Sequence, residues 1–117
     1  RWLLDETIDV ICPMAYWPLT DPPGLRTDFA ALTDDWLVDR PWADQIVMGL
    51  SADYGAFEEI ADEIAWTRAR AGRGVALYDR ASLTTHDHYP ALATGPFADP
   101  AVVPFAWWRA DPGPPAW

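Results

Sequence analysis

Three places in the sequence carry aromatic and acidic side chains directly after a short apolar run. These side chains are Tyr16, Trp17, Asp53, Tyr54, Tyr78 and Asp79. Aromatic rings stack on the apolar faces of pyranose rings, while carboxylates bind sugar hydroxyls or transfer protons. The combination predicts a carbohydrate site, and the alternative is that the aromatic rings only fill the interior.

Asp53 and Asp79 are the carboxylates that come immediately after the second and third apolar runs. Glycoside hydrolysis uses two carboxyl groups, roughly 5–5.5 Å apart for retention and about 6.5–9.5 Å for inversion. We therefore take Asp53 as the candidate catalytic acid. The other five side chains, Tyr16, Trp17, Tyr54, Tyr78 and Asp79, are candidate substrate-binding residues. The alternative role for each acid is to cap the helix or loop that follows it.

Two further groups of residues could bind a metal ion or react, but a structural role is favoured for each. His86 and His88 flank Asp87, a spacing at which two imidazoles can share a metal ion, but no further ligands cluster there, and a polar loop is the favoured interpretation. Cys12 lies inside an apolar run and is expected to be a small buried residue. No metal and no cofactor is predicted, and a phosphosugar substrate is disfavoured because the later loops lack a glycine-rich phosphate cradle.

The charge of the chain bears on its partners. Its 117 residues include 18 acidic side chains against 8 basic ones, all arginine, which gives a net charge of −10. Such a balance argues against nucleic acid and anionic membrane surfaces, because it would not neutralise phosphates. No apolar run approaches the ~18 residues of a membrane span. A neutral oligosaccharide or polysaccharide is the partner that fits best.

The elements that would position these residues alternate between strands and helices. Continuous apolar runs over 8–17, 45–50 and 74–78 predict strands covered on both faces, with the first weakened at Pro13, which lacks an N–H. Apolar spacing predicts helices over 29–36, capped by Thr27, and over 56–71, stopped by Gly72. Residues 2–4 resemble the tail of a helix, and the chain from residue 81 onward is expected to be irregular, with at most a short helix. This order predicts an α/β fold with parallel βαβ units.

Three segments resemble strands of the glycosyl hydrolase-like 10 family, and they occur in the family's order. They are Ile8–Tyr16, similar to a D-x-[IV]-x-P-[QM]-x-Y strand; Val47–Tyr54, similar to a G-x-x-x-Y strand end; and Gly74–Leu83, similar to a G-[VA]-x-x-F-S-x-x-x-L strand. The proline-flanked stretch 100–104 is similar to the segment that ends the barrel. Two departures concern the site: Met14 stands where glutamine is frequent, and Tyr78-Asp79 stands where Phe-Ser is usual, so Asp79 inherits no family role.

The resemblance implies a (β/α)8 TIM-type barrel in a secreted or envelope-associated bacterial protein. A closed barrel needs roughly 250 residues, so this chain would be a fragment of one. Residues 1–108 would be its C-terminal portion, about strands six to eight, and residues 109–117 would be a loosely ordered tail. The family's acidic strand ends, around the fourth strand, would lie upstream of this fragment.

The leading functional hypothesis is a carbohydrate-active, hydrolase-like barrel acting on O-glycosidic bonds of a bacterial cell-wall glycan or another polysaccharide. The alternatives are a noncatalytic glycan-binding or scaffolding barrel, and an unrelated small α/β domain.

Overall fold

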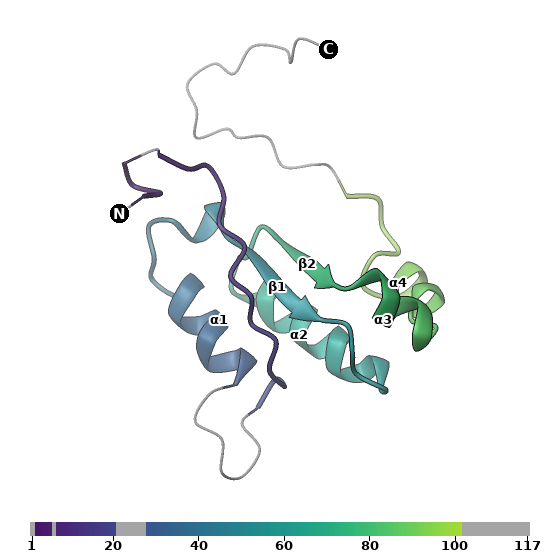
Figure 1. Cartoon of the computed structure of the whole chain (residues 1–117). Coiled ribbons are helices and arrows are strands. Elements are labelled where there is room, and N and C mark those ends of the chain that lie inside the picture. Colours follow the sequence, from purple (N-terminus) through teal and green to yellow (C-terminus); the bar gives the residue numbers. More distant parts are fainter. Residues whose placement is uncertain (1, 6, 21–27, 102–117) are drawn as a thin grey trace.

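The computed structural model describes residues 2–5, 7–20 and 28–101 of the chain. Within this part the chain forms a small α/β unit of two parallel strands and four α-helices with one 3-10 turn (Figure 1). The elements are α1 (Phe29–Leu37), η1 (Ala43–Gln45), β1 (Val47–Ser51), α2 (Phe57–Ala69), β2 (Gly74–Tyr78), α3 (Arg80–Thr85) and α4 (Tyr89–Thr94). The α/β class predicted from the sequence is confirmed, and the finer assignment to about strands six to eight of a (β/α)8 barrel stays a prediction.

The two strands form the βαβ unit that the apolar runs predict. Strands β1 and β2 pair in parallel, with Val47 opposite Gly74 and Ser51 opposite Tyr78, and α2 makes the connection between them. Parallel neighbours need such a crossover, because the chain must return to the same end of the sheet before the next strand begins. Both strands therefore deliver their C-terminal residues to one edge.

The predicted first strand is an extended segment joined to β1 by two isolated parallel bridges. Ile11 pairs with Ile46, and Met14 pairs with Gly49. In this register the amide of residue 13 would donate to the carbonyl of Val47 between the two bridges. Pro13 has no N–H, so this hydrogen bond is missing and the ladder is interrupted. The weakening expected at the proline is present, and the strand is divided by it.

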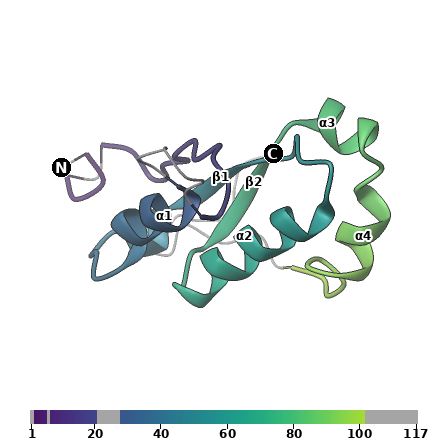
Figure 2. The same cartoon turned by 90° about the horizontal axis from the view of Figure 1, so that it is seen from below.

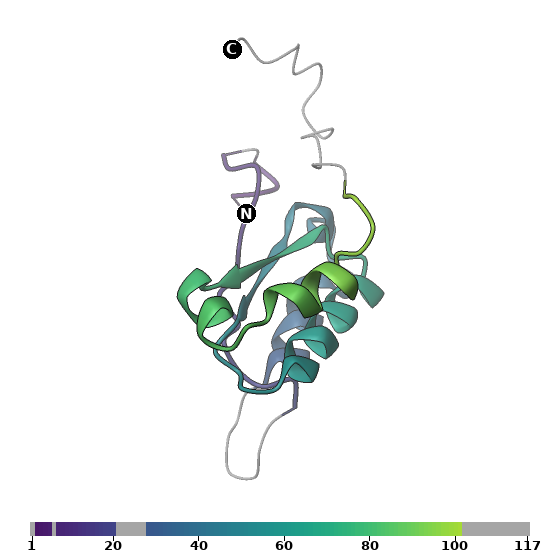
Figure 3. The same ribbon diagram turned by 90° about the vertical axis from the view of Figure 1, so that its right-hand side faces the viewer.

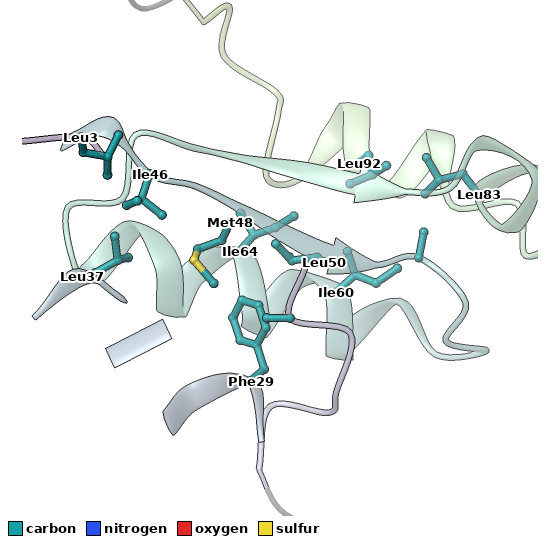
Figure 4. Close-up of a cluster of buried hydrophobic side chains, with 12 residues drawn as sticks. Leu3, Phe29, Leu37, Ile46, Met48, Leu50, Ile60, Ile64, Leu83 and Leu92 are labelled. Carbon is teal, nitrogen blue, oxygen red and sulfur yellow. The ribbon is translucent and has the colours of Figure 1, made fainter. Parts of the chain in front are cut away.

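Helices α1 and α2 lie side by side on one face of the sheet (Figure 2). Met48 and Leu50 of β1 point toward that face and are completely buried (Figure 4). Successive strand residues point to opposite faces. The second face therefore receives the alternate side chains, and several of these are exposed, including Met14 at 70% and Tyr78 at 61%. The expectation that the strands are covered on both faces is thus wrong for the described part of the chain.

The hydrophobic core occupies the layer between the sheet and the helices (Figure 4). Its members come from every described element except the 3-10 turn and β2, and β2 contributes partly buried Val75 and Leu77. The buried residues are Leu3, Ala15, Phe29, Leu37, Ile46, Met48, Leu50, Ala52, Ile60, Ile64, Leu83 and Leu92. Because the core lies on one side only, helices cover one face of the sheet, and the other face, the open face, is exposed.

The helix boundaries agree with the apolar spacing, but two capping assignments change. Asp28 caps α1, with its carboxylate accepting a hydrogen bond from the Ala31 amide at 2.6 Å, whereas Thr27 lies outside the described residues. Beyond α2 the left-handed backbone conformation belongs to Ala71, with φ of 57°, rather than to Gly72. Gly72 is needed for close packing instead, because a Cβ there would lie 2.6 Å from the Thr67 methyl group.

The two ends of the described chain also differ from expectation. Residues 2–5 form turns rather than a helix tail, and the stretch after residue 80 holds two short helices, α3 and α4, beyond the C-terminal end of β2 (Figure 3). The predicted tail, 109–117, lies outside the described residues, as does most of the 100–104 stretch. Among the described helices, none combines the length and apolar character needed to cross a bilayer.

Candidate functional site

Tyr16 and Tyr78 come together on the open face, at the C-terminal ends of the paired segments. Their rings stack with centroids 5.3 Å apart and planes inclined by 17°. The Met14–Gly49 bridge, continued by two residues, places Tyr16 opposite Ser51, and Ser51 pairs with Tyr78. The small serine between them lets the two rings meet across β1. Two candidate residues 62 positions apart in the sequence therefore form one aromatic surface.

The other aromatic candidates lie in two different environments. Trp17 follows Tyr16 and is 40% exposed, so its ring is accessible to a ligand. The hydroxyl of Tyr54 is buried and has no hydrogen-bond partner among the described residues. Burial, reinforced by Glu63 and Glu59, raises the pKa of Tyr54. Tyr54 therefore points into the protein and is not part of the aromatic surface made by Tyr16 and Tyr78.

Asp79 caps α3. Its Oδ1 accepts hydrogen bonds from the Ser82 amide at 2.9 Å and from the Ser82 hydroxyl at 2.8 Å. These bonds, the backbone one first, lower the pKa of Asp79, so the group is a carboxylate at neutral pH. The peptide bond that joins Tyr78 to Asp79 is cis. The capping alternative considered for Asp79 from the sequence is the one that the structure contains.

Asp53 lies in the loop between β1 and α2, where its carboxylate meets a histidine. Oδ1 of Asp53 is 3.0 Å from Nε2 of His86, which ends α3. The Asp53 side chain is 75% exposed and that of His86 27% exposed, so the pair is accessible to solvent. Sequence reasoning missed this pairing, because nothing in the local pattern relates two residues 33 positions apart.

The loops after β1 and β2 are tied to each other by further contacts around this pair. The Ala52 amide donates to the Tyr78 carbonyl at 2.6 Å. Nε2 of His88, a buried residue, lies 2.7 Å from the Tyr54 carbonyl oxygen, and the His86 and His88 rings stack with centroids 5.4 Å apart. A carbonyl only accepts hydrogen bonds, so Nε2 of His88 carries the proton. These contacts therefore join the segments that follow β1 and β2 at the C-terminal ends of the strands.

A buried carboxyl group lies behind this edge. Glu63 of α2 is completely buried, and neither of its oxygens has a hydrogen-bond partner among the described residues. Burial raises the pKa of Glu63 to about 8; the nearby Tyr54 hydroxyl partly offsets this rise, and Glu59 adds to it. The group is therefore mostly protonated at neutral pH, which is how a protein tolerates a buried acid without a counter-ion. The sequence does not indicate that Glu63 is buried, apart from the apolar residues that surround it on the helix.

Cysteine and metal chemistry find little support in the described residues. Cys12 is exposed rather than buried, because its position in the interrupted ladder faces the open side of the sheet, and partial burial still raises the pKa of its thiol. In the described ranges, no group of three or more histidine, cysteine and carboxylate side chains is arranged so that it could hold a metal ion. The rings of His86 and His88 stack on each other, and His86 contacts the carboxylate of Asp53.

Comparisons with protein-family models, with curated protein sequences and with solved structures gave no match. The resemblance to the glycosyl hydrolase-like 10 family therefore stays a prediction made from the three strand segments. What the chain does must be argued from its own geometry.

Proposed function

We propose that this chain is part of a (β/α)8-type barrel that binds a neutral glycan at the C-terminal ends of its strands and acts on O-glycosidic bonds. The observation that carries the proposal is the stacked pair of Tyr16 and Tyr78, exposed on the sheet face that no described helix covers. Pyranose rings present apolar C–H faces, for which an exposed aromatic surface is the usual partner.

The one-sided packing supports the barrel part of the proposal. In a (β/α)8 barrel the helices form an outer ring, and the inner face of the sheet packs against the remaining strands. Here α1 and α2 cover one face, while the other carries exposed Met14 and Tyr78 beside small Gly49 and Ala76. Active sites of such barrels lie at the C-terminal ends of the strands, and this is the edge at which Tyr16 and Tyr78 lie.

The ligand class follows from charge as well as from shape. Asp79 directly follows Tyr78 in the sequence, and Asp53 lies two residues after Ser51. The whole chain carries a net charge of −10. An anionic ligand would be repelled by this negative charge, whereas a neutral sugar would gain hydroxyl–carboxylate hydrogen bonds. Trp17, which is 40% exposed, extends the accessible aromatic area next to Tyr16.

The hydrolytic part of the proposal depends on the carboxyl groups near the aromatic surface. Hydrolysis requires two carboxyl groups, and Asp79 is engaged in its helix cap, which leaves Asp53 as the local acid to test. The capped state of Asp79 favours the second candidate function, a glycan-binding barrel without catalysis.

A binding experiment on the full 117-residue chain tests the proposal. Cellotetraose and chitotetraose serve as neutral probes, and intrinsic fluorescence together with NMR shifts reports binding. We expect Tyr16→Ala and Tyr78→Ala each to weaken binding by about tenfold, the effect of losing one aromatic contact. Tyr89→Ala is the matched control, because Tyr89 is similarly exposed but lies on α4.

Three outcomes separate the candidates. Binding accompanied by shorter sugar products that disappear in Asp53→Asn, even at sugar concentrations that saturate the variant, supports hydrolysis, and binding without products supports the noncatalytic protein. If neither probe binds at millimolar concentration, or if both tyrosine variants bind like the Tyr89→Ala control, the glycan proposal is wrong and an unrelated α/β domain is the better description.

A further inference from the structure

We propose that His86, oriented by Asp53, is a second recognition point of the glycan site and accepts a hydrogen bond from a sugar hydroxyl through Nδ1. This inference rests on the proposed function, since it adds a polar contact to the aromatic surface of Tyr16 and Tyr78. It assigns a positioning role to Asp53, the candidate catalytic acid predicted from the sequence.

Two contacts fix the orientation of the His86 imidazole. Nε2 of His86 lies 3.0 Å from Oδ1 of Asp53, and one face of the ring stacks on His88 at a centroid distance of 5.4 Å. His88 is itself held, because it is buried and its Nε2 donates to the Tyr54 carbonyl at 2.7 Å. A ring that is bonded at one nitrogen and stacked on an anchored neighbour has little freedom to turn.

This orientation determines which nitrogen of His86 carries the proton. A carboxylate accepts hydrogen bonds and cannot donate them, so Nε2 of His86 must carry the proton. In the neutral ring Nδ1 is then an acceptor with a free lone pair. No hydrogen bond to Nδ1 of His86 is present among the described residues, and its side chain is 27% exposed. The pair therefore presents an acceptor to solvent, as carboxylate–histidine pairs do where a histidine must bind a ligand with one defined nitrogen.

The His86–Asp53 pair lies at the end of the sheet that carries the aromatic surface. Asp53 follows Ser51 by two residues, and Ser51 is the residue across which Tyr16 and Tyr78 stack. The intervening Ala52 donates its amide to the Tyr78 carbonyl at 2.6 Å. Asp53 lies in the loop after β1, and His86 ends α3, the helix that follows β2, so the pair belongs to the segments that leave the same end of the sheet as the aromatic surface. A sugar ring has a hydrophobic face and a rim of hydroxyl donors, which are the two features that these neighbouring groups match.

The orientation itself can be measured without any ligand. At pH 8, where a histidine ring is ordinarily neutral, two-bond ¹H–¹⁵N correlation spectra of the full chain distinguish the two tautomers. We expect the Nε2–H form at His86. Asp53→Asn should reduce that form, because the asparagine amide can donate to Nε2 and leave the proton on Nδ1. Asp87→Asn, which removes a neighbouring acid, should leave the His86 tautomer unchanged.

Binding of cellotetraose and chitotetraose at the same pH tests the recognition role. We expect His86→Ala and Asp53→Asn each to weaken binding by about tenfold, the size expected for one hydrogen bond, with Asp87→Asn at the wild-type value. His86→Gln should recover part of the loss, since its side-chain carbonyl is again an acceptor. Rescue by glutamine separates hydrogen bonding from a purely structural role of the ring.

The two proposals fail in different ways. If binding depends on Tyr16 and Tyr78 but not on His86 or Asp53, the glycan site stands and the role of His86 is overturned. If His86 is found in the Nδ1–H form in the wild-type chain, the orientation argument is wrong whatever binds. If neither sugar binds, the proposed function fails and the recognition role fails with it.

Discussion

The carboxyl group of Glu63 lies in the interior next to the hydroxyl of Tyr54, and neither group meets hydrogen-bond geometry with a partner among the described residues. Burial is the main reason that the pKa of Glu63 rises to about 8. Native proteins contain few such groups, and each has an energetic consequence. Here the consequence is a dependence of stability on pH.

We expect the chain to lose stability between about pH 4.5, the ordinary value for glutamate, and the folded-state value near 8. The folded pKa is raised, so the stabilisation is fully present below the unfolded value and is lost as the pH rises through the folded value. Each unit of difference corresponds to about 1.4 kcal/mol, so the total is on the order of a few kcal/mol. Urea unfolding midpoints at pH 5, 7 and 9 measure it.

Glu63→Gln should flatten this pH profile and raise the midpoint at pH 9, because a neutral amide cannot ionise. Glu58→Gln is the matched control, since Glu58 is an exposed acid on the same helix. If the two variants show the same pH profile, the buried carboxyl is not the source of the dependence.

Gly49 is required where the interrupted first strand meets β1. A Cβ at this position would lie 2.8 Å from the Pro13 carbonyl oxygen and 3.4 Å from the Met14 Cα. Gly49→Ala should therefore destabilise the chain by about 1–3 kcal/mol through overpacking. Gly55→Ala is the control, because nothing lies within 4 Å of a Cβ built there. Equal unfolding midpoints for the two variants would show that the segment does not approach β1 this closely.

Asp79→Ala should shorten or fray α3, because it removes the acceptor of both Ser82 hydrogen bonds. We expect Tm at pH 7 to fall by about 4 °C, and Asp79→Ser to retain most of the cap. The pKa of Asp79 is lowered by these bonds. Its contribution is therefore present above the ordinary value and lost as the pH falls through the lowered one. Wild type and Asp79→Ala should accordingly converge in strongly acidic buffer, and a constant difference down to pH 2 would contradict the cap.

Cys12 reports on the open face of the sheet. Its thiol is exposed, and partial burial raises its pKa, so the rate of maleimide labelling should increase as the pH rises above neutrality. We expect the native chain to react within about tenfold of the urea-unfolded chain at pH 8. Labelling that is slower by several orders of magnitude would mean that another surface, such as a second copy, covers this face. Cys12→Ser serves as the blank.

The elements with a local cause were predictable from the order of the residues. The apolar spacing of Phe29, Leu32 and Trp36 predicted α1, and the short apolar runs predicted β1 and β2 with their parallel connection. The effect of Pro13 was predictable as well, because a missing N–H acts wherever the residue is placed. The same reasoning selected Tyr16 and Tyr78, since the C-terminal ends of parallel strands share one edge.

Which of these residues contact each other depends on how the chain folds in space. The stacking of Tyr16 on Tyr78 depends on the register of three chain segments and on the small size of Ser51 between them. The pairing of Asp53 with His86 and the burial of Glu63 depend on how the loops and helices pack. Such contacts join residues far apart in the chain, so no periodic pattern in the sequence indicates them.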